Sequence, residues 1–158
     1  MPTTPPLTIR LATTDDIDLL IRVRQDFNDE WHPHSPAETA ARAAQFRSYL
    51  AAHLSDNTFA AVLGFVATDL ASTAFLLVGD YPSNCTIPHG RKATLINVYT
   101  YPAYRRQGYG EQVVTAAINV ARTRGADVLD LEATDMARPL YHRLGFGLRP
   151  DTPMRFPL

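Results

Sequence analysis

Cysteine is nearly absent from this chain, which has only Cys85 among its 158 residues. A single thiol excludes a disulfide within the chain and leaves the redox compartment open, so the default expectation is a cytoplasmic protein. Long apolar runs are also missing, since no stretch approaches the ~20 residues that span a bilayer. The start of the chain, with Pro2, Pro5 and Pro6, lacks the charged and apolar segments of a secretory leader. We therefore expect a soluble protein that is retained in the cell and has no membrane partner.

Charge of one sign is missing as well. The 15 basic and 16 acidic residues give a formal net charge of -1, whereas proteins that bind nucleic acid usually carry a basic surface. The sequence thus predicts no nucleic-acid partner. His32 and His34 stand close together, but no third or fourth ligand accompanies them, so we also expect no metal site.

What the chain does contain is enough apolar sequence for one core. With 46% hydrophobic residues, a chain of 158 residues should bury roughly 70% of its unfolded surface. No repeat or linker interrupts it, which predicts a single domain over residues 1–158.

The apolar pattern and the turn residues place the secondary structure. A cap at Ser35, a proline at position 36 and a glutamate at position 38 mark the clearest helix start. Strands are predicted at residues 7–12, 59–68, 71–79, 91–101, 127–133 and 153–156. Helices are predicted at residues 17–27, 37–54, from 108 onward, and 138–144. This order predicts an α+β fold with a mixed, mostly antiparallel sheet flanked by helices.

One segment, NVYTYPAYRRQGYG at residues 97–110, joins an apolar strand to a helix through a glycine-containing turn. Backbone N–H groups at a helix N-terminus bind anions, and glycines at 108 and 110 let an anion approach the backbone closely. Arginine pairs with phosphate oxygens through its planar fork. The segment therefore predicts a pyrophosphate-binding loop built from Arg105, Arg106, Gln107, Gly108, Tyr109 and Gly110.

Two other phosphate-binding motifs are alternatives for this segment. A dinucleotide-binding fold needs GxGxxG early in the chain, but Val113 stands at the third glycine position. Asp130 lies at a tolerable distance for the ribose-binding acid, yet it falls inside a predicted strand. No GxxxxGK is present, which excludes a P-loop.

A second segment, ATDMARPLYHRLGF at residues 133–146, follows at a natural distance. Together the two segments resemble the GCN5-related N-acetyltransferase (GNAT) superfamily, whose acetyl-CoA loop reads Q/RxxGxG/A and whose later helix often reads ARPLYxxLGF. The resemblance runs from about residue 7 to 156 and is specific from about 97 to 146. It implies a GNAT-like fold and an acetyl-CoA-dependent N-acetyltransferase.

In that reading the acetyl group moves to a primary amine of a small molecule or peptide by direct attack in a ternary complex. Family precedent also implies homodimers. Two alternatives stay open: a noncatalytic CoA-sensing module, and a dinucleotide-binding oxidoreductase domain.

The resemblance also assigns cofactor contacts. The strands at 91–101 and 127–133 should splay apart, with backbone groups of Val98 and Thr100 pairing with the pantetheine arm. Asp135, Ala137 and Arg138 should flank the other side of that arm. Many relatives have asparagine where this chain has Asp135, and an ionised carboxylate can only accept a hydrogen bond.

For catalysis, the resemblance implies Tyr141 as the proton donor to the departing thiolate and the Val98 N–H as the donor to the carbonyl oxygen. Reference pKa values near 10 for a phenol and 8.5 for a thiol make full proton transfer uphill by roughly 2 kcal/mol, so a hydrogen bond that strengthens with the charge on sulfur is favoured. The alternative for Tyr141 is a packed ring in the core.

No general base is evident. Thr94 occupies the position of the glutamate used by histone-type relatives, and at pH 7 deprotonating a lysine-like amine takes about 4.6 kcal/mol against about 1 for an α-amine. Cys85 is expected to be buried and has no adjacent base, which disfavours an acetyl-cysteine route. Candidate acceptor-site residues are Glu30 and Trp31 between the first two helices, Asn84 in the irregular 81–90 loop, and Glu132 at a strand end.

Overall fold

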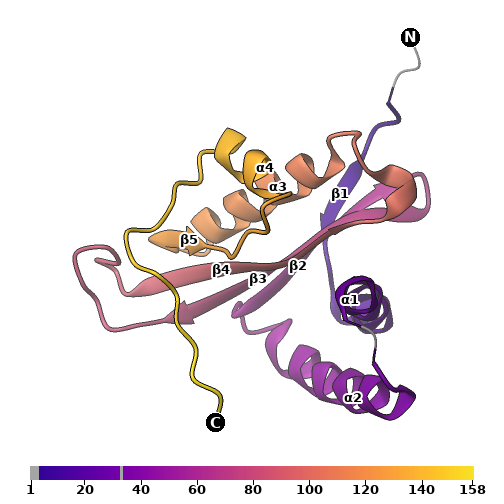
Figure 1. Ribbon diagram of the computed structural model, residues 1–158, viewed down its shortest axis with the longest axis horizontal. Helices are drawn as coiled ribbons and strands as arrows, with labels where there is room; N and C mark the ends of the chain where they lie inside the picture. Colours follow the sequence, from indigo (N-terminus) through magenta and orange to yellow (C-terminus); the bar gives the residue numbers. More distant parts are fainter. Residues whose placement is uncertain (1–3, 33) are drawn as a thin grey trace.

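The strands form one twisted sheet (Figure 1). The computed structural model describes residues 4–32 and 34–158, and within these the strands are β1 (Thr8–Leu11), β2 (Phe59–Val66), β3 (Asp69–Asp80), β4 (Arg91–Thr100) and β5 (Val128–Asp130). They lie side by side in chain order. The pairs from β1 to β4 are antiparallel, whereas β5 runs parallel to β4.

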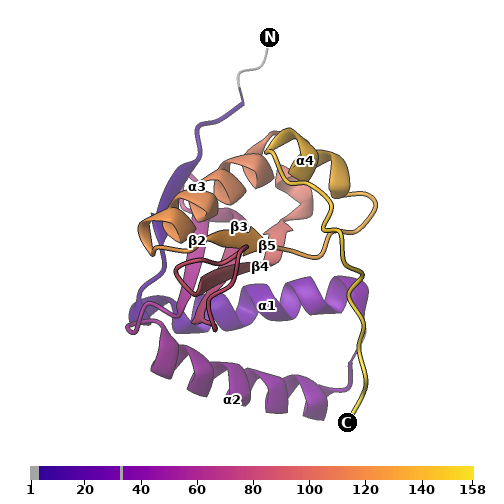
Figure 2. The ribbon, with the colours of Figure 1, turned by 90° about the vertical axis from the view of Figure 1, so that its left-hand side faces the viewer.

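Helices cover both faces of this sheet (Figure 2). The helices are α1 (Ile17–Trp31), α2 (Pro36–His53), α3 (Tyr109–Thr123) and α4 (Arg138–Arg143), with 3₁₀ turns η1 (Thr14–Asp16) and η2 (Pro102–Tyr104). α1 and α2 pack on one face and α3 and α4 on the other, so the sheet separates two apolar clusters. The predicted α+β class is confirmed.

The predicted helix start at Ser35 is confirmed by a reciprocal cap. The Ser35 hydroxyl accepts a hydrogen bond from the Glu38 N–H at 3.3 Å, and the Glu38 carboxylate accepts one from the Ser35 N–H at 3.0 Å. The 3₁₀ turn η1, which leads into α1, is stabilised by different contacts. The buried Asp16 carboxylate accepts from the Thr13 N–H at 2.8 Å and pairs with Arg10.

Two of the strand predictions are wrong. The strand predicted at 127–133 ends at Asp130, and the strand predicted at 153–156 is not formed. Three prolines between residues 150 and 157 remove backbone donors from this tail. Arg149 holds the tail against the sheet through an ion pair with Asp130 at 2.9 Å, so side-chain contacts replace a strand ladder.

Candidate functional site

The turn between β4 and α3 presents free backbone donors. Gly108 is the N-cap of α3, no side chain caps this helix, and both Gly108 (φ 80°) and Arg106 (φ 62°) have left-handed backbone conformations. Within residues 4–32 and 34–158, the N–H groups of Arg106, Gln107 and Gly108 donate to no acceptor. We call residues 106–110 the phosphate loop. Its donors lie at the positive end of a helix, which favours an anion.

The two glycines of the phosphate loop have different surroundings. A Cβ on Gly110 would lie 3.3 Å from the Thr100 hydroxyl and 3.9 Å from the Leu140 side chain, so glycine lets α3 approach β4 and α4 closely. A Cβ on Gly108 would meet nothing within 4 Å. The space next to the Gly108 Cα is therefore open.

The two predicted phosphate arginines have separate surroundings. The Arg105 Nε donates to the Thr100 carbonyl at 2.8 Å, and its terminal nitrogen donates to both Glu30 carboxylate oxygens at 2.7 and 2.6 Å. This contact joins the end of α1 to the phosphate loop, and the Arg105 guanidinium lowers the pKa of Glu30. Arg106 forms no ion pair with the described residues, so its guanidinium is available to a ligand.

The side chains of Gln107 and Tyr109 are occupied by the protein itself. Gln107 donates its amide to the Ala103 carbonyl at 3.3 Å. The Tyr109 ring is 1% exposed, and its hydroxyl donates to the Pro5 carbonyl at 2.8 Å. Both residues can therefore offer a ligand their backbone N–H groups but not these side chains.

Replacing Glu30 by glutamine should test the contact with Arg105. Because the folded state lowers the Glu30 pKa below 4.5, the pair stabilises the fold above that pH and this stabilisation disappears as pH falls through the lowered pKa. Both side chains are partly exposed, 40% for Arg105 and 30% for Glu30, so we expect E30Q to lose about 1 kcal/mol at most at pH 7. Urea unfolding of both proteins at pH 7 and pH 3 checks this. An equal deficit at the two pH values would contradict it.

β4 and β5 separate along the part of β4 that leads to the phosphate loop. Their last register pair is Thr94 with Asp130, after which β4 continues to Thr100 alone on that side. Within this free part Asn97 and Val98 together lie opposite Ala74, which makes a β-bulge, and Asn97 has a φ of 50°. The strands therefore open at the place where the resemblance puts the pantetheine arm.

Tyr141 on α4 lies on the face of the sheet that α3 and α4 cover. Its side chain is 7% exposed in the apolar cluster against which Val98 also packs, and its ring meets Phe146 edge-on at 5.6 Å between centroids. Burial raises the pKa of Tyr141, so the phenol stays protonated at neutral pH. Its hydroxyl has no hydrogen-bond partner in the part of the chain that the structure describes. Tyr141 is thus both a packed ring and an available proton donor.

The segment before α4 holds the remaining predicted cofactor residues. Ala137 is the N-cap of α4 and packs against the cluster around Tyr141. The Asp135 side chain is 92% exposed and pairs with Arg138 at 2.6 Å. This ion pair uses one Asp135 carboxylate oxygen, and the other oxygen can still accept a hydrogen bond from a pantetheine amide.

The candidate acceptor residues do not form one cluster. Glu30 and Trp31 belong to the last turn of α1 instead of a loop, and Trp31 is 46% exposed. The Asn84 side-chain oxygen accepts from the N–H groups of Thr86 and Ile87 at 2.8 and 3.0 Å, so it shapes its own loop. Glu132 is exposed and lies beyond the end of β5, which corrects its predicted place in a strand.

Two other predictions are corrected or refined here. Cys85 is exposed, against the expectation that it is buried. A carboxylate does lie near the Thr94 position, because Asp130 is its register partner. That carboxylate is bound by Lys92 at 2.7 Å and by Arg149 at 2.9 Å, so it is occupied by two cations.

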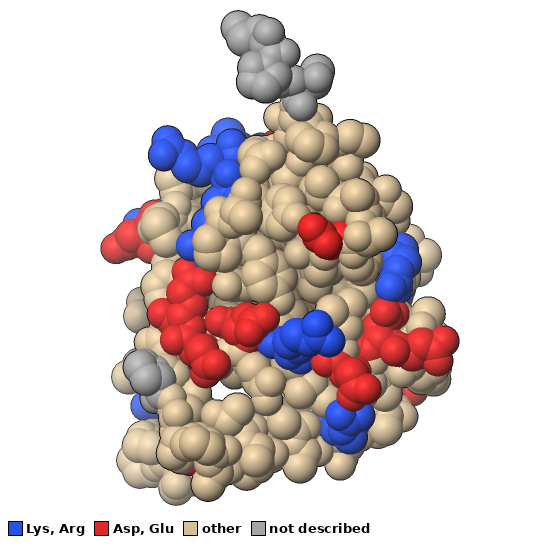
Figure 3. All heavy atoms as spheres, turned by 90° about the vertical axis from the view of Figure 1, so that its right-hand side faces the viewer, with Lys and Arg blue, Asp and Glu red and all other residues tan. Residues whose placement is uncertain are grey.

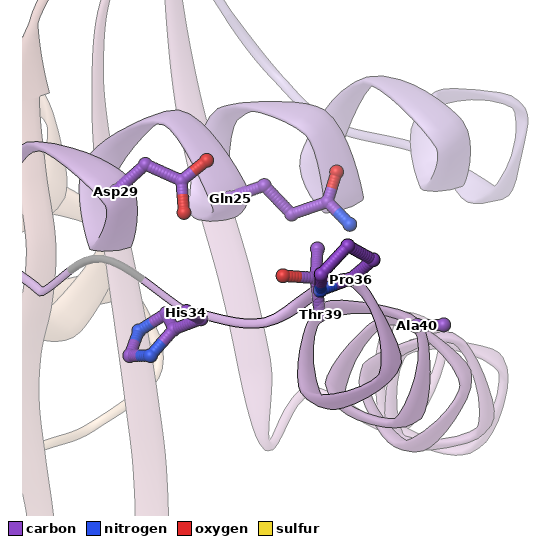
Figure 4. Close-up of a pocket in the computed structure, with 6 residues that line it drawn as sticks. All are labelled: Gln25, Asp29, His34, Pro36, Thr39 and Ala40. Carbon is purple, nitrogen blue, oxygen red and sulfur yellow. The ribbon is translucent and has the colours of Figure 1, made fainter.

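A groove of about 590 Å³ lies between the end of α1 and the start of α2. Figure 4 shows Asp29 and Gln25 on α1 across from the chain that runs from His34 into α2, with the Gln25 amide directed towards Pro36 and His34 nearer to Asp29. The groove thus offers a carboxylate, an amide and an imidazole beside the residues predicted for the acceptor. The predicted acceptor residues Glu30 and Trp31 lie near this groove, but Gln25 and Asp29 were not predicted. Helix spacing alone does not show which face of α1 meets α2.

Arg24 and Asn97, which meet beneath the bulge of β4, were not predicted as site residues. The sequence places Arg24 only within the helix predicted at 17–27, and Asn97 only at the start of the 97–110 segment. The signal was present, because an asparagine in the apolar run Leu95 to Tyr99 interrupts the strand pattern and tolerates a left-handed conformation.

Comparison with known proteins identifies the family. The model of the acetyltransferase (GNAT) family matches residues 18–146, so this chain belongs to the GNAT family. The predicted family and enzyme class, an N-acetyltransferase, are therefore confirmed. Over 59 residues the chain is 40% identical to the [ribosomal protein bS18]-alanine N-acetyltransferase of Haemophilus ducreyi, a match that spans 35% of this chain and 41% of that relative.

Solved structures agree with this fold over nearly the whole chain. A GCN5-related N-acetyltransferase from Ralstonia eutropha is 26% identical, with a TM-score of 0.82 over 97% of this chain and 99% of that one. A predicted acetyltransferase from Clostridium acetobutylicum, solved with acetyl-CoA, is 24% identical, with a TM-score of 0.81 over 96% of each chain.

Within the described residues, no helix is long and apolar enough to cross a membrane, and no cluster of three or more His, Cys, Asp or Glu residues could hold a metal ion.

Proposed function

We propose that this protein is an acetyl-CoA-dependent N-acetyltransferase, with its catalytic domain over residues 1–158. The observation that carries the proposal is the phosphate loop, where uncapped N–H groups lie at the head of α3 and a Cβ on Gly108 would meet nothing within 4 Å. A pyrophosphate would satisfy these donors. The opening between β4 and β5 begins after Thr94 and Asp130 and follows β4 to Thr100, just before the loop. It would receive the pantetheine arm, and a structural neighbour was solved with acetyl-CoA.

In this proposal the backbone of the phosphate loop and the Arg106 side chain bind the pyrophosphate, while Arg105 fixes the loop by holding Glu30 and Thr100. Backbone groups of Val98 and Thr100 pair with the arm. The flanking residues Asp135, Ala137 and Arg138 line its other side, where Asp135 can accept through the carboxylate oxygen that Arg138 does not bind.

Acetyl-CoA supplies the acetyl group as a thioester. The Val98 N–H donates a hydrogen bond to the carbonyl oxygen as negative charge develops there. The Tyr141 hydroxyl donates to the sulfur as it departs, and its buried ring fixes that hydroxyl in position. The neutral acceptor amine attacks the carbonyl directly in a ternary complex, the C–S bond breaks as the C–N bond forms, and the proton that the amine loses passes to water. A route through Cys85 is disfavoured, because within the described residues this exposed thiol has no base in hydrogen-bond contact.

The acceptor is proposed to be a primary amine of a small molecule or peptide. Figure 3 shows a band of acidic side chains on the face seen from the right of Figure 1, with basic side chains among them. The second half of α1 contains three acidic residues, Asp26, Asp29 and Glu30. Such a surface attracts a cationic amine more than a polyanion, which agrees with the prediction of no nucleic-acid partner. The relative from Haemophilus ducreyi is named for an alanine of ribosomal protein bS18, which is a protein acceptor.

Calorimetry with acetyl-CoA, CoA and NAD tests the cofactor proposal, and thiol release tests turnover. We expect acetyl-CoA and CoA to bind, NAD to give no heat, and acetyl-CoA with a suitable amine to release free thiol. Binding without thiol release from any amine would favour the CoA-sensing module. NAD binding without CoA binding would refute the proposal.

We also propose a homodimer that forms through the C-terminal tail. The tail exposes four large apolar side chains, between 81% and 118% of their reference areas: Leu148, Met154, Phe156 and Leu158. In solution such side chains favour association with a second copy. Light scattering should give a dimer mass for the full chain and a monomer mass after M154D and F156D are combined. A monomeric full chain would refute this proposal. The predicted cytoplasmic location stays a prediction from the sequence.

A further inference from the structure

Arg24 is a partly buried cation with almost no protein partner. Its guanidinium lies over the Phe46 ring, 5.0 Å from the centroid, and within residues 4–32 and 34–158 it forms no ion pair. Its one hydrogen bond goes to the Asn97 side-chain oxygen at a long 3.4 Å, although a guanidinium has five N–H donors. Burial lowers the Arg24 pKa, because no carboxylate compensates its loss of water.

Asn97 has a matching deficiency. Its side chain is buried, at 6% exposure, and its Nδ2 amide group has no hydrogen-bond partner in the described chain. A left-handed φ of 50° explains why asparagine suits the backbone of the bulge. It does not explain a buried donor without an acceptor, which is costly in a folded protein.

The position of this pair relates it to the reaction. Asn97 directly precedes Val98, and consecutive Cα atoms are about 3.8 Å apart. The pair lies on the α1 side of β4, whereas Val98 packs towards α3 and α4. A group bound by Arg24 and Asn97 would thus lie beside the thioester but across the strand from the cofactor.

We propose that Arg24 and Asn97 bind the carboxylate of the acceptor, and that the acceptor is a free α-amino acid. This inference rests on the proposed function and names the substrate class of the same site. A carboxylate would accept hydrogen bonds from the guanidinium and from the Asn97 Nδ2, and would give both groups the partner that they lack. Its α-amine would then lie next to the Val98 N–H that holds the acetyl carbonyl.

Charge favours an amino acid over the N-terminus of a peptide. A peptide would present a neutral carbonyl to Arg24, and the guanidinium would stay without a counter-charge. The carboxylate nearest Thr94, that of Asp130, is bound by two cations and is therefore not free to act as a general base. An α-amine suits such a site, since its own deprotonation at pH 7 takes only about 1 kcal/mol.

Thiol release from acetyl-CoA, measured with each L-amino acid and with its α-amide, tests this inference. We expect the wild type to prefer amino acids, and R24M to lower kcat/KM for the best amino acid about 30-fold while changing its α-amide about twofold or less. The KM for acetyl-CoA should stay unchanged. N97D, which keeps the shape but replaces the donor by a carboxylate, should lower kcat/KM for amino acids in the same way.

R22M is the matched control, because Arg22 lies on the same helix, is exposed and forms no ion pair with the described residues. It should retain the preference for amino acids. Equal rates for amino acids and amides in the wild type, or a preference for an N-terminal peptide, would overturn the inference and leave the proposed function standing. Absence of thiol release with every amine would refute the proposed function itself.

Discussion

Replacing Tyr141 by phenylalanine should lower kcat about 100-fold, the usual contribution of a positioned proton donor, with the KM for acetyl-CoA nearly unchanged. The ring would still fill its buried site and meet Phe146, so only the hydroxyl is lost. Because that hydroxyl has no partner in the described chain, its removal should not destabilise the fold. Steady-state kinetics with thermal unfolding separates the two effects.

Y104F provides the control for this experiment. Tyr104 also carries a phenol near the phosphate loop, but its hydroxyl donates to the Asp69 carboxylate in an exposed contact at 3.0 Å. Its replacement should leave kcat unchanged. Since burial raises the Tyr141 pKa, loss of its proton should lower kcat only at a higher pH than it would for an ordinary phenol. An unchanged kcat in Y141F would remove Tyr141 from the mechanism.

Replacing Gly108 by alanine should weaken acetyl-CoA binding about tenfold or more. The φ of 80° at Gly108 is unfavourable for any residue with a Cβ, by roughly 1–2 kcal/mol. The loop can relieve this strain only by rotating its peptide units, which turns the N–H groups away from the pyrophosphate. Calorimetry with CoA measures the change directly and does not depend on the acceptor.

G147A is the matched control for the phosphate loop. Gly147 lacks a positive φ, and an added Cβ there would meet nothing within 4 Å. It should bind CoA as the wild type does. If G108A bound CoA with unchanged affinity while G147A did the same, the backbone of this loop would not be the pyrophosphate site.

The sequence was sufficient to predict the starts of helices that depend on neighbouring residues. The cap from Ser35 to Glu38 fixed the start of α2, and the glycine at position 108 predicted the start of α3. The tail was predicted wrongly because a strand requires a partner. Its prolines and the Arg149 ion pair decided against one, and only the fold brings Asp130 within reach of Arg149.

The roles of particular side chains divide in the same way. Sequence alone was sufficient for the family, and it predicts the phosphate loop and Tyr141 as site residues, because a backbone that binds an anion needs glycines and a helix start at fixed spacing. Only the tertiary structure decided that Arg105 holds Glu30, 75 residues away, and that Arg24 meets Asn97, 73 residues away. Hydrogen bonds and burial depend on distance in space, and residues so far apart in the chain become neighbours only when α1 packs against β4.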